Sequence, residues 1–140
     1  LIPALSRDYQ VIAIPTRGHG KSELGGRPLS YRLFADDCAA VIRSLKVPPV
    51  NLIGFSDGAI TAYQVAATHP DVVGRLIAVG GPLGFQDYSA AGAAELDQYN
   101  TPAKLAALAP KFVAERKWLM PDSTAWNSFV GQLADMWSQR

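Results

Sequence analysis

One stretch decides the fold: Val50-Asn51-Leu52-Ile53-Gly54-Phe55-Ser56-Asp57-Gly58. Residues 50–53 form a short and mostly apolar run, which is typical of a strand that is buried on both faces. The alanine-rich residues 59–68 follow and predict a helix that stops before His69-Pro70. The chain is therefore expected to turn sharply from strand to helix, with Ser56 at the corner.

A turn of this kind predicts chemistry at its central residue. It strains the backbone of Ser56, and small residues two positions before and after it, Gly54 and Gly58, are expected to keep the turn free of clashes. The Ser56 hydroxyl would stand where open α/β sheets bind ligands, and the Asp57 N–H would face a developing oxyanion. The same glycine–serine–glycine pattern also arises by accident, but its position between strand and helix favours a serine nucleophile for acyl transfer.

Two further strands are expected, at residues 9–14 and 76–79. Ser30 is a plausible cap for a helix before the second strand. That helix carries apolar residues at spacings of three and four: Phe34, Cys38, Val41, Ile42 and Leu45. Strands thus alternate with helices, which predicts the α/β class with a parallel sheet in the order strand-helix-strand-helix-strand.

The pattern changes after Gly84, where strand signals give way to helical ones. Residues 90–96 are expected to be helical, and Thr101-Pro102 begins another helix. Asp122 is expected to cap a last helix with one broad apolar face, formed by Trp126, Phe129, Val130, Leu133 and Trp137. We therefore divide the chain into a partial α/β core, residues 1–85, and a helical segment, residues 86–140. The segment is either a lid over a pocket, which we favour, or a layer packed on the sheet.

The composition excludes several classes of function. The 140 residues carry 13 basic and 12 acidic side chains, a net charge of +1, with no charge run to attract nucleic acid or an anionic membrane. No apolar run approaches the roughly 20 residues that span a bilayer, and no signal peptide is recognisable. The single cysteine, Cys38, fits a reducing compartment. We expect a cytoplasmic protein that acts on a small molecule, and its oligomeric state stays open.

Three segments together resemble the α/β-hydrolase family. Residues 15–22, Pro-Thr-Arg-Gly-His-Gly-Lys-Ser, are similar to the family's loop after an early strand. Residues 54–58 match its nucleophile elbow, and residues 69–77 are similar to the passage from the elbow helix into the next strand. The order and spacing of all three agree over about half of the chain. The resemblance implies a serine hydrolase of esterase or aminopeptidase type, without cofactor or metal, that cleaves an ester, an amide or an activated C–C bond.

The chain also departs from the family pattern. Pro15 stands where the family usually has a structural Asp. The family's catalytic acid and His follow the serine, in that order, yet no strand signal is visible after Val79 and no histidine follows His69. We therefore expect a fragment of a hydrolase that is inactive alone, with its acid, its His and a second oxyanion donor outside the chain. The alternative is a truncated, inactive hydrolase-like protein that serves as a binding module.

Other reactive side chains have simpler explanations. His69 would lie at the far end of the helix after Ser56, about 20 Å away at a rise of roughly 1.5 Å per residue. His19 is expected near the same sheet edge as a loop residue, and Asp87 as a solvated loop carboxylate. Asp36-Asp37 suits a charged helix face, and Cys38 suits the core. No spacing of His, Cys and carboxylates predicts a metal site.

Overall fold

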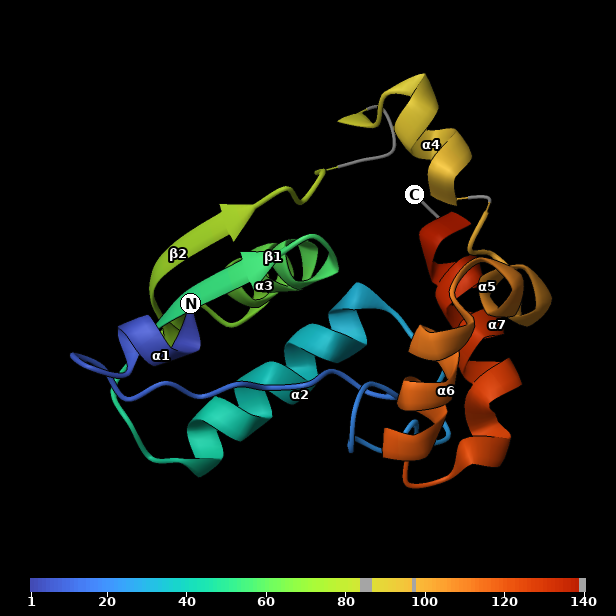
Figure 1. The fold of residues 1–140 in the computed structure, drawn as a ribbon. Helices are drawn as coiled ribbons and strands as arrows, with labels where there is room; N and C mark the ends of the chain where they lie inside the picture. Colours follow the sequence, from blue (N-terminus) through green and yellow to red (C-terminus); the bar gives the residue numbers. More distant parts are fainter. Residues whose placement is uncertain (84–86, 97, 139–140) are drawn as a thin grey trace.

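The computed structural model describes residues 1–83, 87–96 and 98–138. The predicted boundary between residues 85 and 86 therefore lies outside the described residues. The elements, shown in Figure 1, are α1 (Ile2–Leu5), α2 (Tyr31–Ser44), β1 (Val50–Phe55), α3 (Asp57–Thr68), the 3-10 turn η1 (Pro70–Val72), β2 (Val73–Val79), α4 (Ala90–Leu96), α5 (Pro102–Leu108), α6 (Pro110–Leu119), the 3-10 turn η3 (Ser123–Ala125) and α7 (Trp126–Ser138).

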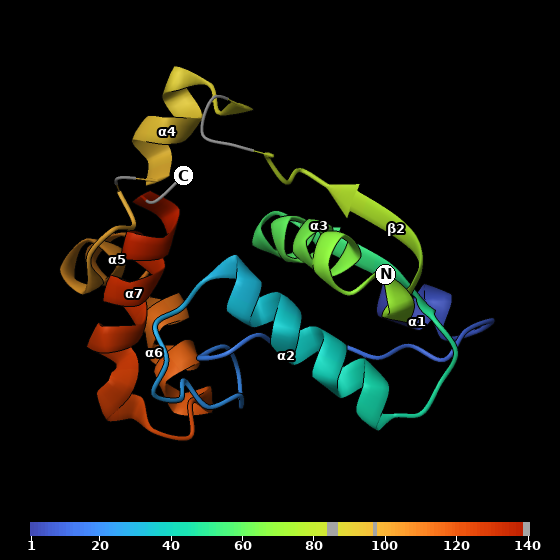
Figure 2. The same cartoon turned by 180° about the vertical axis from the view of Figure 1, so that it is seen from behind.

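The unit β1-α3-β2 carries the predicted corner. β1 and β2 are parallel, with Ile53 opposite Ile77 and Phe55 opposite Val79. α3 lies against one face of this sheet in both views (Figures 1 and 2). Its fully buried Val65 belongs to a cluster with Ala39 and Ile42 of α2, which packs behind α3. The other face exposes side chains from both strands: Ile53, Phe55, Ile77 and Val79.

The strand expected at residues 9–14 is not formed. Within the described residues the sheet has the order β1-β2, and residues 10–16 have no ladder partner. Ile14 packs on the cluster between α2 and the sheet, whereas Tyr9 is exposed. The β-branched pattern indicates side chains that suit a buried, pleated surface. It does not show whether a neighbouring strand is present to complete a hydrogen-bonded ladder. The prediction was right about burial at Ile14 and wrong about pairing.

Helix α2 joins the two halves of the molecule. The Ser30 side chain accepts a hydrogen bond from Leu33 N at 3.1 Å, which confirms the predicted cap. The predicted apolar face was partly wrong, because Val41 and Leu45 are exposed, at 37% and 43%. The side chains that α2 buries are Leu33, Phe34, Ala35, Ala39 and Ile42. Two small alanines on this face let α3 approach closely, a contact that a count of large apolar residues overlooks.

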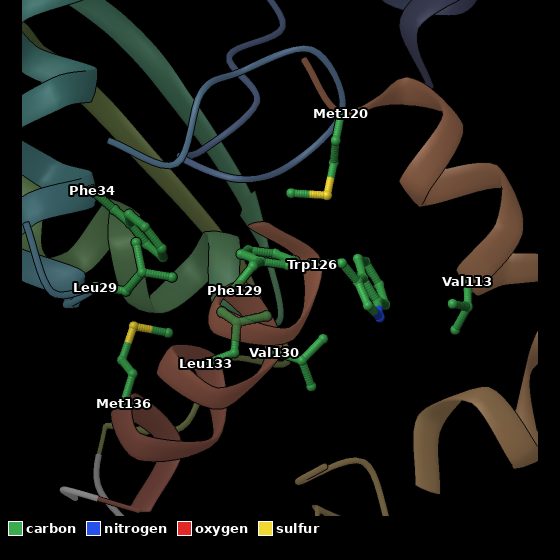
Figure 3. Close-up of a cluster of buried hydrophobic side chains, with 9 residues drawn as sticks. All are labelled: Leu29, Phe34, Val113, Met120, Trp126, Phe129, Val130, Leu133 and Met136. Atoms are coloured by element: carbon green, nitrogen blue, oxygen red, sulfur yellow. The ribbon is translucent and has the colours of Figure 1, made fainter. Parts of the chain in front are cut away.

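The C-terminal helices gather at the N-terminal end of α2 (Figure 1). Thr101 caps α5, as predicted, and Asp122 caps η3, which leads directly into α7. Figure 3 shows the apolar face of α7 meeting Phe34 and Leu29 from the first half of the chain. The buried members of this lid cluster are Leu29, Phe34, Val113, Met120, Trp126, Phe129, Val130, Leu133 and Met136. None of the helices in the described ranges has the length and apolarity needed to cross a membrane.

A group of charged side chains fastens α2 to the end of α3. His69 Nε2 lies 2.8 Å from Asp36 Oδ1, and Arg43 pairs with Asp71 at 2.8 Å. Asp36 was expected on a charged helix face, and it is only partly buried there, but the sequence did not predict its hydrogen bond to His69. The hydrogen bond from His69, assisted by Arg32, lowers the pKa of the Asp36 carboxyl. His69 ends α3, which is the structural role that the sequence predicted.

We predict that this contact makes stability sensitive to acid. The folded-state pKa of Asp36 lies below its ordinary value of 3.8. The contribution of the ionised Asp36 carboxylate to folding stability is therefore complete above pH 3.8, and it is lost as the pH falls through the lowered pKa. Asp36→Asn should flatten the fall in the free energy of unfolding below about pH 4. Urea titrations across this range, with the exposed Asp135→Asn as control, test it, and an unchanged pH profile would contradict it.

Candidate active site

Ser56 occupies the corner between β1 and α3 in a strained conformation. Its φ and ψ are 54° and −122°, which a non-glycine residue adopts only under constraint. Ser56 N–H donates to Val79 O at 2.9 Å, and Ser56 O accepts from Ala59 N at 2.8 Å. These bonds fix the corner from both sides while the residue itself remains exposed. The expected strand-to-helix turn is therefore present, with the serine at the carboxyl end of β1.

The two glycines of the motif have different roles. A Cβ at Gly54 would lie 2.3 Å from Gly58 O and 2.7 Å from the Cα of Ala59, so any side chain there collides with backbone. A Cβ at Gly58 would meet nothing within 4 Å. Gly54 therefore cannot carry a side chain without a clash, whereas Gly58 has room for one. The backbone of Gly58 is what crowds Gly54, whereas the open side of Gly58 faces space.

We predict opposite outcomes for alanine at these two positions. Gly54→Ala should destabilise the protein by more than about 2 kcal/mol, because the colliding atoms are backbone and cannot move aside. Gly58→Ala is the matched control and should change stability by less than about 1 kcal/mol, since alanine suits the first turn of α3. Urea denaturation measures both, and equal effects of the two substitutions would contradict this geometry.

Asp57 has one role in its backbone and another in its side chain. Its N–H is at the first position of α3, among the amides that a helix leaves without an intrahelical acceptor. Its carboxylate accepts from Tyr31 Oη at 2.7 Å and from Trp137 Nε1 at 2.9 Å. The two donors come from the start of α2 and the end of α7. The side chain of Asp57 therefore ties the C-terminal helices to the corner that holds Ser56.

This tie was not predicted from the sequence. Trp137 was assigned to an apolar helical face, and in the structure it does pack partly buried against the lid cluster. Its indole N–H nevertheless reaches an acid 80 positions earlier in the chain. A tryptophan at the end of an apolar stripe is a weak signal for such a bond, because a half-buried indole N–H needs an acceptor.

We predict that Trp137→Phe loosens α7. The substitution removes the indole N–H, and with it the bond to a charged group, along with part of the ring, which should destabilise the protein by about 1–3 kcal/mol. Amide hydrogen exchange should rise in α7 more than in α3. Trp118→Phe removes the same atoms from a ring that is 82% exposed and should leave both measurements unchanged. Unaltered exchange in α7 of the Trp137 variant would show that the bond contributes nothing.

The glycine-rich loop, residues 15–22, is held by an ion pair with α2 and by a hydrogen bond within the loop. Arg17 forms a two-pronged pair with Asp37 of α2, and one of its bonds, Nη2 to Oδ1, is 2.8 Å long. Ser22 Oγ donates to the carbonyl oxygen of Pro15 at 2.9 Å. Asp37 is thus a loop anchor, which corrects the prediction of a solvated helix face. The loop is secured although Pro15 stands where the family usually has Asp.

His19 is packed inside this region. Its Nδ1 lies 2.8 Å from Thr16 Oγ1 and 3.1 Å from Arg17 O, and its ring meets Phe34 and Phe129 edge-on. Burial is the largest effect on its pKa, which is lowered. The bond to Arg17 O and the charge of Asp57 raise the pKa, and the charge of Arg116 lowers it. His19 is therefore a packed loop residue, as expected.

Neither histidine of the chain is hydrogen-bonded to Ser56. His19 uses Nδ1 on its own loop, and His69 lies at the other end of α3 beside Asp36. Asp87 Oδ2 accepts a hydrogen bond from Leu83 N at 2.8 Å. Residues 1–83, 87–96 and 98–138 contain no group of three His, Cys, Asp or Glu side chains that could hold a metal ion.

Cys38 lacks the surroundings of a reactive cysteine. It is partly buried and packs on the cluster between α2 and the sheet, which matches the core role expected from the sequence. Burial raises the pKa of its thiol. Reactive cysteines need the opposite shift, because the thiolate is the attacking form.

Comparisons with known proteins agree with this geometry. A family profile described as "alpha/beta hydrolase fold" matches residues 1–129. The (E)-2-((N-methylformamido)methylene)succinate hydrolase of Acinetobacter baylyi is 34% identical over 80 residues, which cover 57% of this chain and 30% of the relative. Serine hydrolase BPHL of Homo sapiens is 33% identical over 75 residues, covering 51% and 26%. The chain spans less than a third of the length of these relatives.

A solved structure shows the same fold. A hydrolase from Pseudomonas aeruginosa superposes with a TM-score of 0.61 over 96% of this chain and 56% of that protein, at 23% sequence identity. The structural similarity supports the fold, and the match of the family profile supports membership of the family. The chain belongs to the α/β-hydrolase fold family.

Proposed function

We propose that the protein is part of a serine hydrolase in which Ser56 is the nucleophile. The Ser56 hydroxyl attacks an acyl carbon, the leaving group departs, and water then cleaves the acyl-enzyme. The observation that carries this proposal is the positive φ of Ser56, at 54°, in an exposed corner between a parallel strand and a helix. Strain of this kind persists where the surrounding structure enforces it, and it gathers at functional sites.

The surroundings of Ser56 suit the charge that develops in such a reaction. The N–H of Asp57 begins α3, so the positive end of the helix dipole and an unused donor meet at the same corner. Relatives named as a serine hydrolase and as the hydrolase of a formamido compound are consistent with acyl transfer to water. We propose an ester, an amide or an activated C–C bond as the substrate class, and the cytoplasm as its place of action.

The proton acceptor in this proposal is neither His19 nor His69. His19 is hydrogen-bonded within its own loop, and His69 lies beyond the far end of α3. We therefore propose that a histidine and its orienting acid come from polypeptide outside these 140 residues, and that this chain alone does not turn over substrate. The helices α4–α7 would act as a lid, since α7 is tied to the corner through Asp57.

A second candidate function is a hydrolase-like binding module without catalysis. The lack of a hydrogen bond between Ser56 and either histidine favours it. The two candidates differ in the reactivity of Ser56, because a binding module needs no activated hydroxyl.

Labelling by a fluorophosphonate probe tests the proposed function. We predict that this chain reacts weakly or not at all, and that any longer product of the same gene is labelled rapidly. Ser56→Ala should abolish the labelling. Ser44→Ala, which alters a serine of α2 away from the corner, is the control and should leave the labelling intact. If neither product is labelled, the serine-hydrolase mechanism is wrong and the binding module is favoured.

A further inference from the structure

Arg116 of α6 holds a charge that the described residues leave unpaired. Its Nε is buried without a hydrogen-bond partner, the one such side-chain nitrogen or oxygen in the described part of the chain. Its guanidinium carbon lies 4.8 Å from the centre of the Phe112 ring, and the residue itself is partly buried. Buried donors in folded proteins nearly always find acceptors, and an uncompensated guanidinium is more costly still. Stacking on Phe112 stabilises the cation but leaves the N–H without an acceptor.

The position of Arg116 on α6 directs it inward. Val113, one turn earlier, and Met120, one turn later, are both buried in the lid cluster. The same cluster contains Phe34 and Phe129, the two rings that contact His19. The inner face of α6 and the glycine-rich loop therefore border one interior region.

That region also borders the corner of Ser56. The cluster that contains Val113 and Met120 also packs against Trp137, whose indole N–H donates to Asp57, the residue after Ser56. The carboxylate of Asp57 already accepts hydrogen bonds from Tyr31 and Trp137. The carboxylate of Asp57 is thus engaged by other donors, and Arg116 Nε has no acceptor among the described residues.

We propose that Arg116 is an anion-binding residue that receives a carboxylate group of the substrate. The Nε and one Nη of a guanidinium form a planar edge with two parallel N–H donors, which matches the two oxygens of a carboxylate. Arg116 is itself only partly buried and stacks on the exposed Phe112 ring, so its guanidinium lies near solvent, where a small anion can reach it. The inference rests on the proposed function, and it narrows the acyl compound to one that carries a negative charge.

Nuclear magnetic resonance of the Nε–H groups tests the proposal without any need for turnover. The signal of Arg116 is the one lost in Arg116→Lys. Titration of the ¹⁵N-labelled chain with succinate should move this signal saturably, and succinamide, which has the same length without charge, should not move it. The same result is expected in Ser56→Ala, so binding at Arg116 is read independently of the nucleophile. Intact succinate binding together with a longer product that the fluorophosphonate probe does not label would overturn the proposed function alone.

Substitutions complete the test. Arg116→Gln and Arg116→Lys should each weaken succinate binding at least about tenfold, since lysine keeps the charge but lacks the paired donors. Lys117→Gln removes a charge from an exposed neighbouring position on α6 and should leave binding unchanged. If the glutamine variant does not fold, the lysine variant decides the matter. The proposal is overturned by an Arg116 signal that does not saturate, by an equal response to succinamide, or by equal weakening in Lys117→Gln.

Discussion

The close contact between Gly54 and the backbone of Gly58 is the constraint on which the rest of the site depends. It allows β1 to pass into α3 without a connecting loop, and the sharp turn forces Ser56 to a positive φ. The end of β2 supports the turn from the side. The carbonyl oxygen of Val79 accepts a hydrogen bond from Ser56 N–H. Gly81 lies so near α3 that a Cβ on Gly81 would be 2.5 Å from Ala59 Cβ. The strain at Ser56 is therefore held by close-packed neighbours on two sides.

The corner also organises the second half of the molecule. Asp57 is held there by the start of α3, and its carboxylate collects donors from α2 and α7. The lid cluster joins the same elements through apolar contacts, with Phe34 of α2 packed against α7 (Figure 3). Polar and apolar contacts thus fix the C-terminal helices relative to Ser56. This arrangement supports the lid that we propose, and helix α6, which carries Arg116, belongs to the same group of helices.

The sequence predicted those features that depend on neighbours close along the chain. Strand β1, helix α3, the strained corner at Ser56 and the cap at Ser30 follow from local patterns, and the structure contains all four. The failures concern contacts between distant segments. Residues 9–14 have the composition of a strand, but pairing requires a partner that no local pattern reveals. Two hydrogen bonds, from Arg17 to Asp37 and from Trp137 to Asp57, join positions that are far apart in the sequence and that no local pattern connects. The catalytic roles of Ser56 and Asp57 remain predictions that rest on geometry.

Trapping of the acyl-enzyme tests the central claim, that the strained corner presents Ser56 as a nucleophile, most directly. A longer, esterase-active product of the same gene would be mixed with p-nitrophenyl acetate, quenched in acid within the first turnover and mapped by peptide mass spectrometry. The account predicts an acetyl group on the peptide that contains Ser56, located on the serine itself. Hydrolysis that leaves Ser56 unmodified while another side chain carries the acetyl group would contradict it.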